Sequence, residues 1–224
     1  MKKILVVATN HGTLGDTNEA NGTYAPELTH ALEKFFAAGF GFDIASIKGG
    51  VAPIYGEDTE GDAINSMILS RDDVKKKLAN TLVVEQLNLA DYAAIFYPGG
   101  FGLLSDLATH KKTAGLLADY YENGGVIGAV CHGPAGLLPV QLGNGESLLS
   151  KHMVTGFTRE EEVEFGTIEK IPFLLEESLT RSARKYIKRA PWTENVVVDG
   201  RLITGQNPAS ASGVGEAIVN QLLN

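Results

Sequence analysis

Four short apolar runs rich in β-branched residues constrain the fold more than any other feature of this sequence. They cover residues 3–8, 42–47, 93–97 and 126–130. Near-continuous apolar runs of this length are typical of strands that are covered on both faces, as in a parallel sheet. The sequence therefore predicts buried strands at the centre of the fold.

Helical patterns separate these runs. Residues 24–38 place Leu28, Leu32 and Phe35 on one side of a predicted helix. The other predicted elements are a helix ending at 116–121, a helix after residue 131, a hairpin of 196–199 and 202–204, and a last helix from 207 towards 223. Strands that alternate with helices predict an α/β fold with a doubly wound, mostly parallel sheet and helices on both faces.

Two segments fit this plan poorly. Residues 53–77 are polar and turn-rich before they become helical, and residues 143–189 are acidic and irregular. We interpret both as small insertions that cap one end of the sheet. The length of 224 residues suits one domain, residues 1–224, with a sizeable core.

Composition excludes several classes of function. The net charge of −8 disfavours a nucleic-acid or anionic-membrane surface, which needs clustered Lys and Arg. No apolar run approaches the roughly 20 residues that span a bilayer. The apolar run after the first three residues is shorter than the roughly 7–15 residues of a secretory core. We therefore expect a cytoplasmic protein.

The sharpest local feature is the end of the fourth strand, where Val130-Cys131-His132-Gly133-Pro134 follows. A strand-to-helix turn presents its apical side chain at the carboxyl end of the sheet, where ligands bind in open α/β folds. A helix N-terminus favours an anion there, so we expect a thiolate nucleophile at Cys131. The alternative is an inert buried cysteine. Since this is the only cysteine, a Cys-x-x-Cys metal site is excluded.

Three further patterns point to the same place. The turn at 98–102, in which Gly99 and Gly100 follow the end of the third strand, can present N–H groups to an oxyanion. Glu27, in the first turn of a helix, either complements the helix dipole or faces the sulfur as a proton donor or acceptor. One carboxylate of the acidic run at 159–164 can orient the imidazole of His132, whereas most of that run is a solvated face.

These motifs resemble the ThiJ/PfpI superfamily, a cysteine-bearing relative of the class I glutamine amidotransferases. They are most similar to its heat-shock chaperone and glyoxalase III branch. The matching segments are the turn at 98–102, the elbow at 129–135, residues 155–158 with the acidic run, and residues 199–210. The resemblance implies a flavodoxin-like sheet and a homodimer.

The resemblance also implies residue roles. Cys131 would be the nucleophile, His132 would lie beside it, and Glu27 would be the helix-borne acid. The carboxylate partner of His132 falls on Glu162, although a slip in register would move that role to a neighbouring glutamate, Glu160 or Glu161. The backbone N–H groups of Gly100 or Phe101, with that of His132, would line the oxyanion site. Phe157 and Trp192 either line the pocket or pack in the core.

Similar family members convert methylglyoxal to lactate without glutathione, metal or another cofactor. The expected partner is therefore a small aldehyde. The alternatives are a holdase chaperone or protein deglycase that meets misfolded or glycated proteins, and a cysteine-dependent amidohydrolase or peptidase. Glutamine hydrolysis is disfavoured, because His152 is the only histidine after the elbow and no Pro-Glu follows it.

Overall fold

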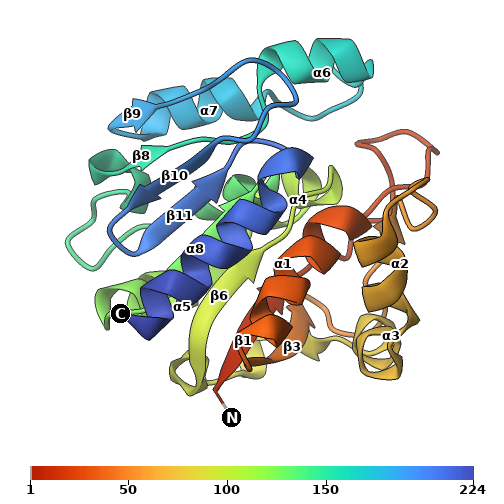
Figure 1. Cartoon of the computed structure of the whole chain (residues 1–224). Helices are drawn as coiled ribbons and strands as arrows, with labels where there is room; N and C mark the ends of the chain where they lie inside the picture. The colour runs from red at the N-terminus through yellow and green to blue at the C-terminus, as the bar shows by residue number, and fades with distance from the viewer. Residues whose placement is uncertain (1) are drawn as a thin grey trace.

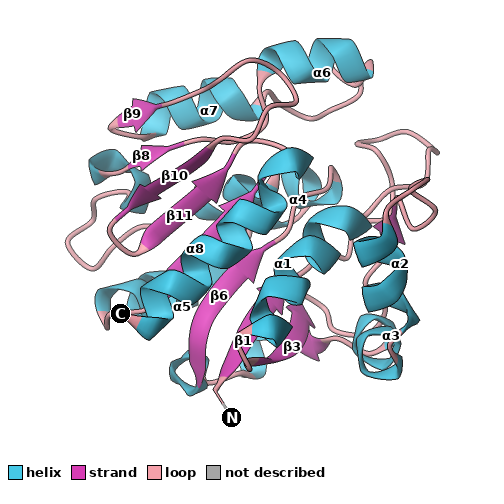
Figure 2. Ribbon diagram, viewed as in Figure 1, coloured by secondary structure: helices cyan, strands magenta, loops and turns pink. Residues whose placement is uncertain are grey.

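The computed structural model describes residues 2–224 and contains a seven-stranded sheet with the order β10-β11-β7-β6-β1-β3-β5 (Figures 1 and 2). Every neighbouring pair is parallel except β10 and β11, which form the predicted hairpin. The predicted α/β fold is thus confirmed. The strands are β1 (Lys3–Val7), β3 (Gly41–Ser46), β5 (Leu82–Val83), β6 (Tyr92–Tyr97), β7 (Val126–Val130), β10 (Val196–Asp199) and β11 (Leu202–Gly205).

Helices cover both faces of this sheet. The helices are α1 (Ala25–Ala37), α2 (Ala63–Ser70), α3 (Asp72–Ala79), α4 (Gly102–Ser105), α5 (Lys111–Glu122), α6 (Arg159–Phe165), α7 (Leu175–Ser182) and α8 (Ala211–Leu223). Helices α1 and α8 lie side by side across one face, in front of β6 in Figure 1, and α5 lies behind the sheet. None of the helices described between residues 2 and 224 has the length and apolarity that crossing a bilayer requires.

Strand periodicity sends alternate side chains into two separate cores. Ile4 and Val6 of β1 belong to the core beneath α1 and α8. Leu5 and Val7 belong to the core that contains the inner face of α5. Since both faces are apolar, the run at 3–8 reads as continuous rather than alternating, which is why it predicts a central parallel strand.

A glycine permits the close contact between α1 and α8. A Cβ built on Gly215 of α8 would lie 3.0 Å from the Cα of Ala31 on α1 and 3.2 Å from its carbonyl oxygen. A larger side chain at this position would therefore push the two helices apart. These two helices carry or precede residues of the pocket described below, so their spacing affects the site.

The structure corrects two of the sequence-based expectations. The turn after Cys131 continues as a five-residue 3-10 helix (Gly133–Leu137) rather than as an α-helix, so the expected helix dipole is short. Residues 53–77 do not cap the sheet: Ile68 of α2 and Val74 of α3 pack in the core beneath α1. From that segment, Tyr55 reaches the pocket.

The second insertion, residues 143–189, does form a cap. Helices α6 and α7 lie beyond the carboxyl ends of the strands, at the top of Figure 1. The short parallel pair β8 (Met153–Val154) and β9 (Lys185–Tyr186) extends this cap beside β10. A second small parallel pair, β2 (Thr23–Tyr24) and β4 (Ile54–Tyr55), joins the start of α1 to the segment that carries Tyr55.

We expect Gly215→Leu to lower the free energy of unfolding by about 1–3 kcal/mol, because the new side chain cannot fit between α1 and α8. The matched control is Gly115→Leu on α5, where an added Cβ meets nothing within 4 Å. That control should be neutral or stabilising by less than about 1 kcal/mol, because Leu favours helix over Gly. Urea denaturation followed by circular dichroism measures both; equal effects would refute the packing argument.

Candidate active site

Cys131 occupies a sharp turn at the carboxyl end of β7. Its φ of 59° lies in the left-handed region, which non-glycine residues rarely adopt. Two backbone hydrogen bonds hold this conformation: the Cys131 N–H donates to Gly205 O at 2.9 Å, and its carbonyl accepts from the Phe157 N–H at 3.0 Å. Strand β11 and the cap therefore fix the direction in which the sulfur points.

The sulfur borders a cavity of about 230 Å³. Six aromatic side chains dominate its wall, and apart from the aromatic residues the reactive groups are those of Glu27, Cys131 and His132. The lining residues are Tyr24, Glu27, Tyr55, Phe101, Cys131, His132, Phe157, Phe165, Trp192 and Pro208. A small apolar cavity with a few convergent polar groups is the usual form of a small-molecule site.

His132 connects the sulfur to a buried carboxylate. Its Nδ1 lies 3.4 Å from Cys131 Sγ, and its Nε2 lies 2.7 Å from Glu162 Oε1. The other oxygen of Glu162 accepts a hydrogen bond from the Thr167 hydroxyl. Since a carboxylate can only accept, the proton of the neutral imidazole lies on Nε2 and Nδ1 is free to accept a proton from the thiol.

Glu27 of α1 is fully buried beside the sulfur. Neither of its carboxyl oxygens has a partner with ordinary hydrogen-bond geometry among residues 2–224. Burial raises the pKa of Glu27 to about 8, although the nearby Cys131 thiol and Gly99 N–H oppose the shift. At neutral pH this side chain is therefore mainly a carboxylic acid facing the cavity.

The expected preformed thiolate is not what the structure indicates. Burial raises the pKa of the Cys131 thiol well above its usual value, and the charge of Glu27 would raise it further. Cys131 is also buried, at 5% exposed, rather than open to solvent. The short 3-10 helix after it does not compensate for this loss of hydration. The Cys131 side chain is therefore mainly a neutral thiol at neutral pH, and His132 Nδ1 is the nearby group that can accept its proton.

The turn between β6 and α4 brings backbone N–H groups to the same cavity. Among the described residues, no acceptor receives a hydrogen bond from the N–H of Gly100, Phe101 or His132. A Cβ on Gly99 would lie 2.2 Å from Glu27 Oε2 and 2.6 Å from Cys131 Cβ, so only glycine allows the approach. Of these residues with unbonded N–H groups, Phe101 and His132 line the cavity and Gly100 precedes Phe101 in the turn.

Glu161 is buried next to Glu162 but faces the opposite way. Its Oε2 accepts from the N–H and hydroxyl of Thr158 in a capping box at the start of α6. Its Oε1 accepts from the N–H of Trp192 and from the side chains of Gln206 and Asn207. One carboxylate thus joins α6, the Trp192 loop and the segment after β11.

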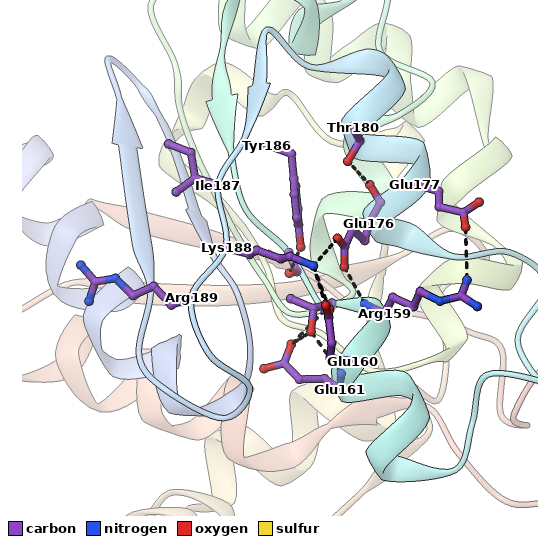
Figure 3. Close-up of polar contacts among 12 residues, drawn as sticks. Arg159, Glu160, Glu161, Glu176, Glu177, Thr180, Tyr186, Ile187, Lys188 and Arg189 are labelled. Atoms are coloured by element: carbon purple, nitrogen blue, oxygen red, sulfur yellow. Dashed lines mark hydrogen bonds and ion pairs between the residues drawn. The ribbon is translucent and has the colours of Figure 1, made fainter.

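A surface network holds the outer side of the cap (Figure 3). Lys188 Nζ lies 2.8 Å from Glu160 Oε1 on α6 and 2.8 Å from Glu176 Oε1 on α7. Glu176 also accepts from the N–H of Arg159 at 2.7 Å. Glu160 therefore points away from the cavity, and Glu162 is the glutamate that contacts His132.

The structure brings the residues singled out in the sequence into one place. Cys131, His132, Glu27, Phe101 and Phe157 all line the cavity, and Glu162 lies directly behind His132. Sequence reasoning missed Tyr24, Tyr55 and Phe165, because no motif distinguishes an aromatic wall from ordinary packing. Within residues 2–224, no cluster of three His, Cys, Asp or Glu side chains could hold a metal ion.

Comparison with known proteins decides the family. A family model described as "DJ-1/PfpI family" matches residues 19–221. This chain belongs to the DJ-1/PfpI family. The resemblance drawn from the sequence motifs is therefore confirmed.

Two curated DJ-1/PfpI relatives match most of the chain. The "Glutathione-independent glyoxalase HSP31" of Saccharomyces cerevisiae is 31% identical and covers 100% of this chain and 99% of its own length. The "Protein/nucleic acid deglycase HchA" of Staphylococcus aureus is 28% identical over 92% of this chain and 73% of its own length. The match to the first extends over the whole of both chains.

Two solved structures have the same fold. The 24 kDa Rapid Encystment Protein of Francisella tularensis superposes with a TM-score of 0.94 at 36% identity, covering 100% of both chains. Glyoxalase III from Candida albicans superposes with a TM-score of 0.88 at 26% identity, covering 98% of this chain and 97% of its own. The cap and the sheet therefore belong together in these proteins as they do here.

The buried Glu27 carboxyl should make stability depend on pH. Its folded-state pKa of about 8 exceeds the ordinary value of 4.5, so the folded protein binds more protons between these values and its stability falls as pH rises. Between pH 6 and 8 the wild type should lose about 2 kcal/mol of unfolding free energy that Glu27→Gln does not lose. Urea denaturation at each pH measures this difference, and parallel curves for the two proteins would contradict it.

Proposed function

We propose that this protein is a glutathione-independent glyoxalase, which converts a 2-oxoaldehyde such as methylglyoxal to the corresponding 2-hydroxy acid. One observation carries the proposal: a thiol and an unpartnered carboxylic acid border the same small, aromatic-walled cavity. The name of the Saccharomyces cerevisiae relative supports it. The overall reaction is an internal redox isomerisation followed by hydrolysis, so the balance needs only water.

In the first step the thiol adds to the aldehyde carbon. Cys131 Sγ forms the C–S bond while His132 Nδ1 takes the thiol proton, and Glu162 stabilises the resulting imidazolium through Nε2. The free N–H groups of Gly100, Phe101 and His132 stabilise the developing oxyanion. Glu27 then protonates that oxygen, which gives a neutral hemithioacetal and leaves Glu27 as a carboxylate.

In the second step Glu27 moves a proton between two adjacent carbons. Its carboxylate removes hydrogen from the former aldehyde carbon, and the enediol that forms accepts the same proton at the neighbouring carbon. The hydroxyl proton passes from the first oxygen to the second. The first carbon is oxidised by two electrons and the second is reduced by two, which yields a thioester of the 2-hydroxy acid.

In the third step water hydrolyses the thioester. The hydroxyl of water joins the acyl carbon, and its other hydrogen returns to Sγ. His132 passes its extra proton back to Glu27, so both groups regain their starting states. This proposal assigns three roles: Cys131 is the nucleophile, Glu27 is the proton shuttle and Glu162 is the carboxylate that orients His132.

A holdase chaperone has one observation in its favour. Val163 and Phe165 on α6 are each 56% exposed, and the sequence alone does not reveal such a patch. However, Phe165 also lines the cavity and stacks on Phe101 at 5.9 Å between ring centroids. We therefore assign this surface to the mouth of the pocket. The homodimer, the cytoplasmic location and the single domain remain predictions.

The purified protein should convert methylglyoxal to lactate in buffer free of glutathione. Because every step passes through the sulfur or the carboxyl, Cys131→Ala and Glu27→Gln should each reduce turnover by at least about 1000-fold. Nuclear magnetic resonance of the reaction mixture measures lactate directly. Turnover that is absent in the wild type, or equal in Cys131→Ala, would refute the proposed function.

The activity should fall as pH rises through about 8. The reaction begins with Glu27 protonated, and its pKa of about 8 means that the acid form disappears above that pH. The profile of kcat/KM between pH 6 and 9.5 measures this, since that ratio reports groups of the free enzyme. A rate that rises steadily over the same range would instead indicate a thiolate that must be formed before substrate binds.

A further inference from the structure

Tyr55 lines the catalytic cavity although no sequence motif marks it. It lies in β4, within the polar segment 53–77, and reaches the cavity beside Glu27 and Cys131. Its ring packs 5.0 Å from that of Tyr24 and 6.4 Å from that of Phe101, measured between centroids. These contacts from two other segments hold the side chain in place.

The hydroxyl of Tyr55 has no hydrogen-bond partner among the residues that the structure describes. Removal from bulk water raises its pKa well above the ordinary value, and the charges of Cys131 and Glu27 add to the shift. The group therefore keeps its proton at neutral pH. A neutral O–H donor without an acceptor borders the cavity in which the thiol attacks.

Two other side-chain N–H donors on the cavity wall are already engaged. Trp192 Nε1 donates to Glu164 Oε2 at 2.5 Å, and His132 Nε2 is bound to Glu162. The hydroxyl of Tyr24 lies near Thr59 and is less deeply buried than that of Tyr55. The N–H groups of the turn serve the oxygen at the carbon that the sulfur attacks. With Glu27 assigned to the proton transfers, the Tyr55 hydroxyl is the more deeply buried donor available to a second oxygen atom.

A 2-oxoaldehyde has such a second oxygen, on the carbon next to the aldehyde. Negative charge develops there when the proton leaves the first carbon, because the electron pair of the broken C–H bond moves into the enediolate. In a cavity with aromatic walls and without a lining Lys or Arg, this charge needs a directed donor.

We propose that the Tyr55 hydroxyl donates a hydrogen bond to the ketone oxygen of a bound 2-oxoaldehyde and so selects dicarbonyl substrates over simple aldehydes. This inference rests on the proposed function and assigns Tyr55 as a further catalytic residue of the same site. It also gives the segment 53–77 a role in the chemistry through one side chain.

The test compares Tyr55→Phe with the wild type, because this change removes the hydroxyl and keeps the ring. Turnover of methylglyoxal should fall about 10- to 100-fold, the usual effect of losing one donor to a developing charge. The matched control is Tyr120→Phe on α5, which loses a hydroxyl that donates to Tyr92 O at the start of β6, the end of that strand away from the cavity. Its kinetics should equal those of the wild type.

A second measurement does not depend on turnover. Alkylation of Cys131 by iodoacetamide is followed by mass spectrometry while methylglyoxal or propanal protects the sulfur as a reversible hemithioacetal. In the wild type, methylglyoxal should protect Cys131 at a lower concentration than propanal does. The ratio of the two protecting concentrations should exceed the ratio measured with free cysteine, which reports only the intrinsic reactivity of the two aldehydes. In Tyr55→Phe that excess preference should fall about 10-fold, whereas alkylation without aldehyde should change less than about twofold.

The two measurements separate the inference from the function on which it rests. If the wild type forms no lactate from methylglyoxal, the glyoxalase proposal is refuted. The protection assay would still report on the role of Tyr55. If Tyr55→Phe keeps the wild-type preference for methylglyoxal, the role of Tyr55 is wrong. It is also wrong if the variant loses alkylation, propanal protection and methylglyoxal protection to the same extent, since that pattern indicates a distorted cavity.

Discussion

A carboxyl group buried without a hydrogen-bond partner, next to the only thiol, is the constraint on which the rest of this structure depends. Removing the Glu27 carboxyl from water is tolerated because it remains protonated, and this requires a dry cavity. Aromatic side chains from five separate segments keep water out. The wall of the site and the protonation state of its acid therefore have the same physical cause.

Helix α6 couples the roof of the cavity to the histidine inside it. Two adjacent residues of this helix bind different partners, because successive side chains on a helix point about 100° apart. Glu161 binds the Trp192 loop and the segment after β11, while Glu162 binds His132. A displacement of the cap would thus move the roof and the imidazole together, and the Lys188 contacts oppose such a displacement.

The sequence predicts the sheet well because each central strand is apolar on both faces, as the 126–130 run shows. It also predicts which residues meet, since the carboxyl ends of β6 and β7 are neighbours. It could not predict the pKa of Cys131, because that depends on how fully distant segments dehydrate the sulfur. It could not identify Tyr55 either, because the sequence pattern around a tyrosine in a polar segment does not predict where its hydroxyl lies in the fold.

The positive φ at Cys131 and the burial of its sulfur have a consequence for the chain outside its reaction. A solvated cysteine is open to any oxidant or electrophile that diffuses by. Here the folded protein withholds the ionised form of sulfur, so chance encounters are mostly unproductive. The Cys131 thiol reacts with a substrate that is small enough to enter the cavity and that can accept a proton there. The fold thus limits access to the thiol, and loss of tertiary packing would leave the one thiol of the chain as reactive as that of a free cysteine.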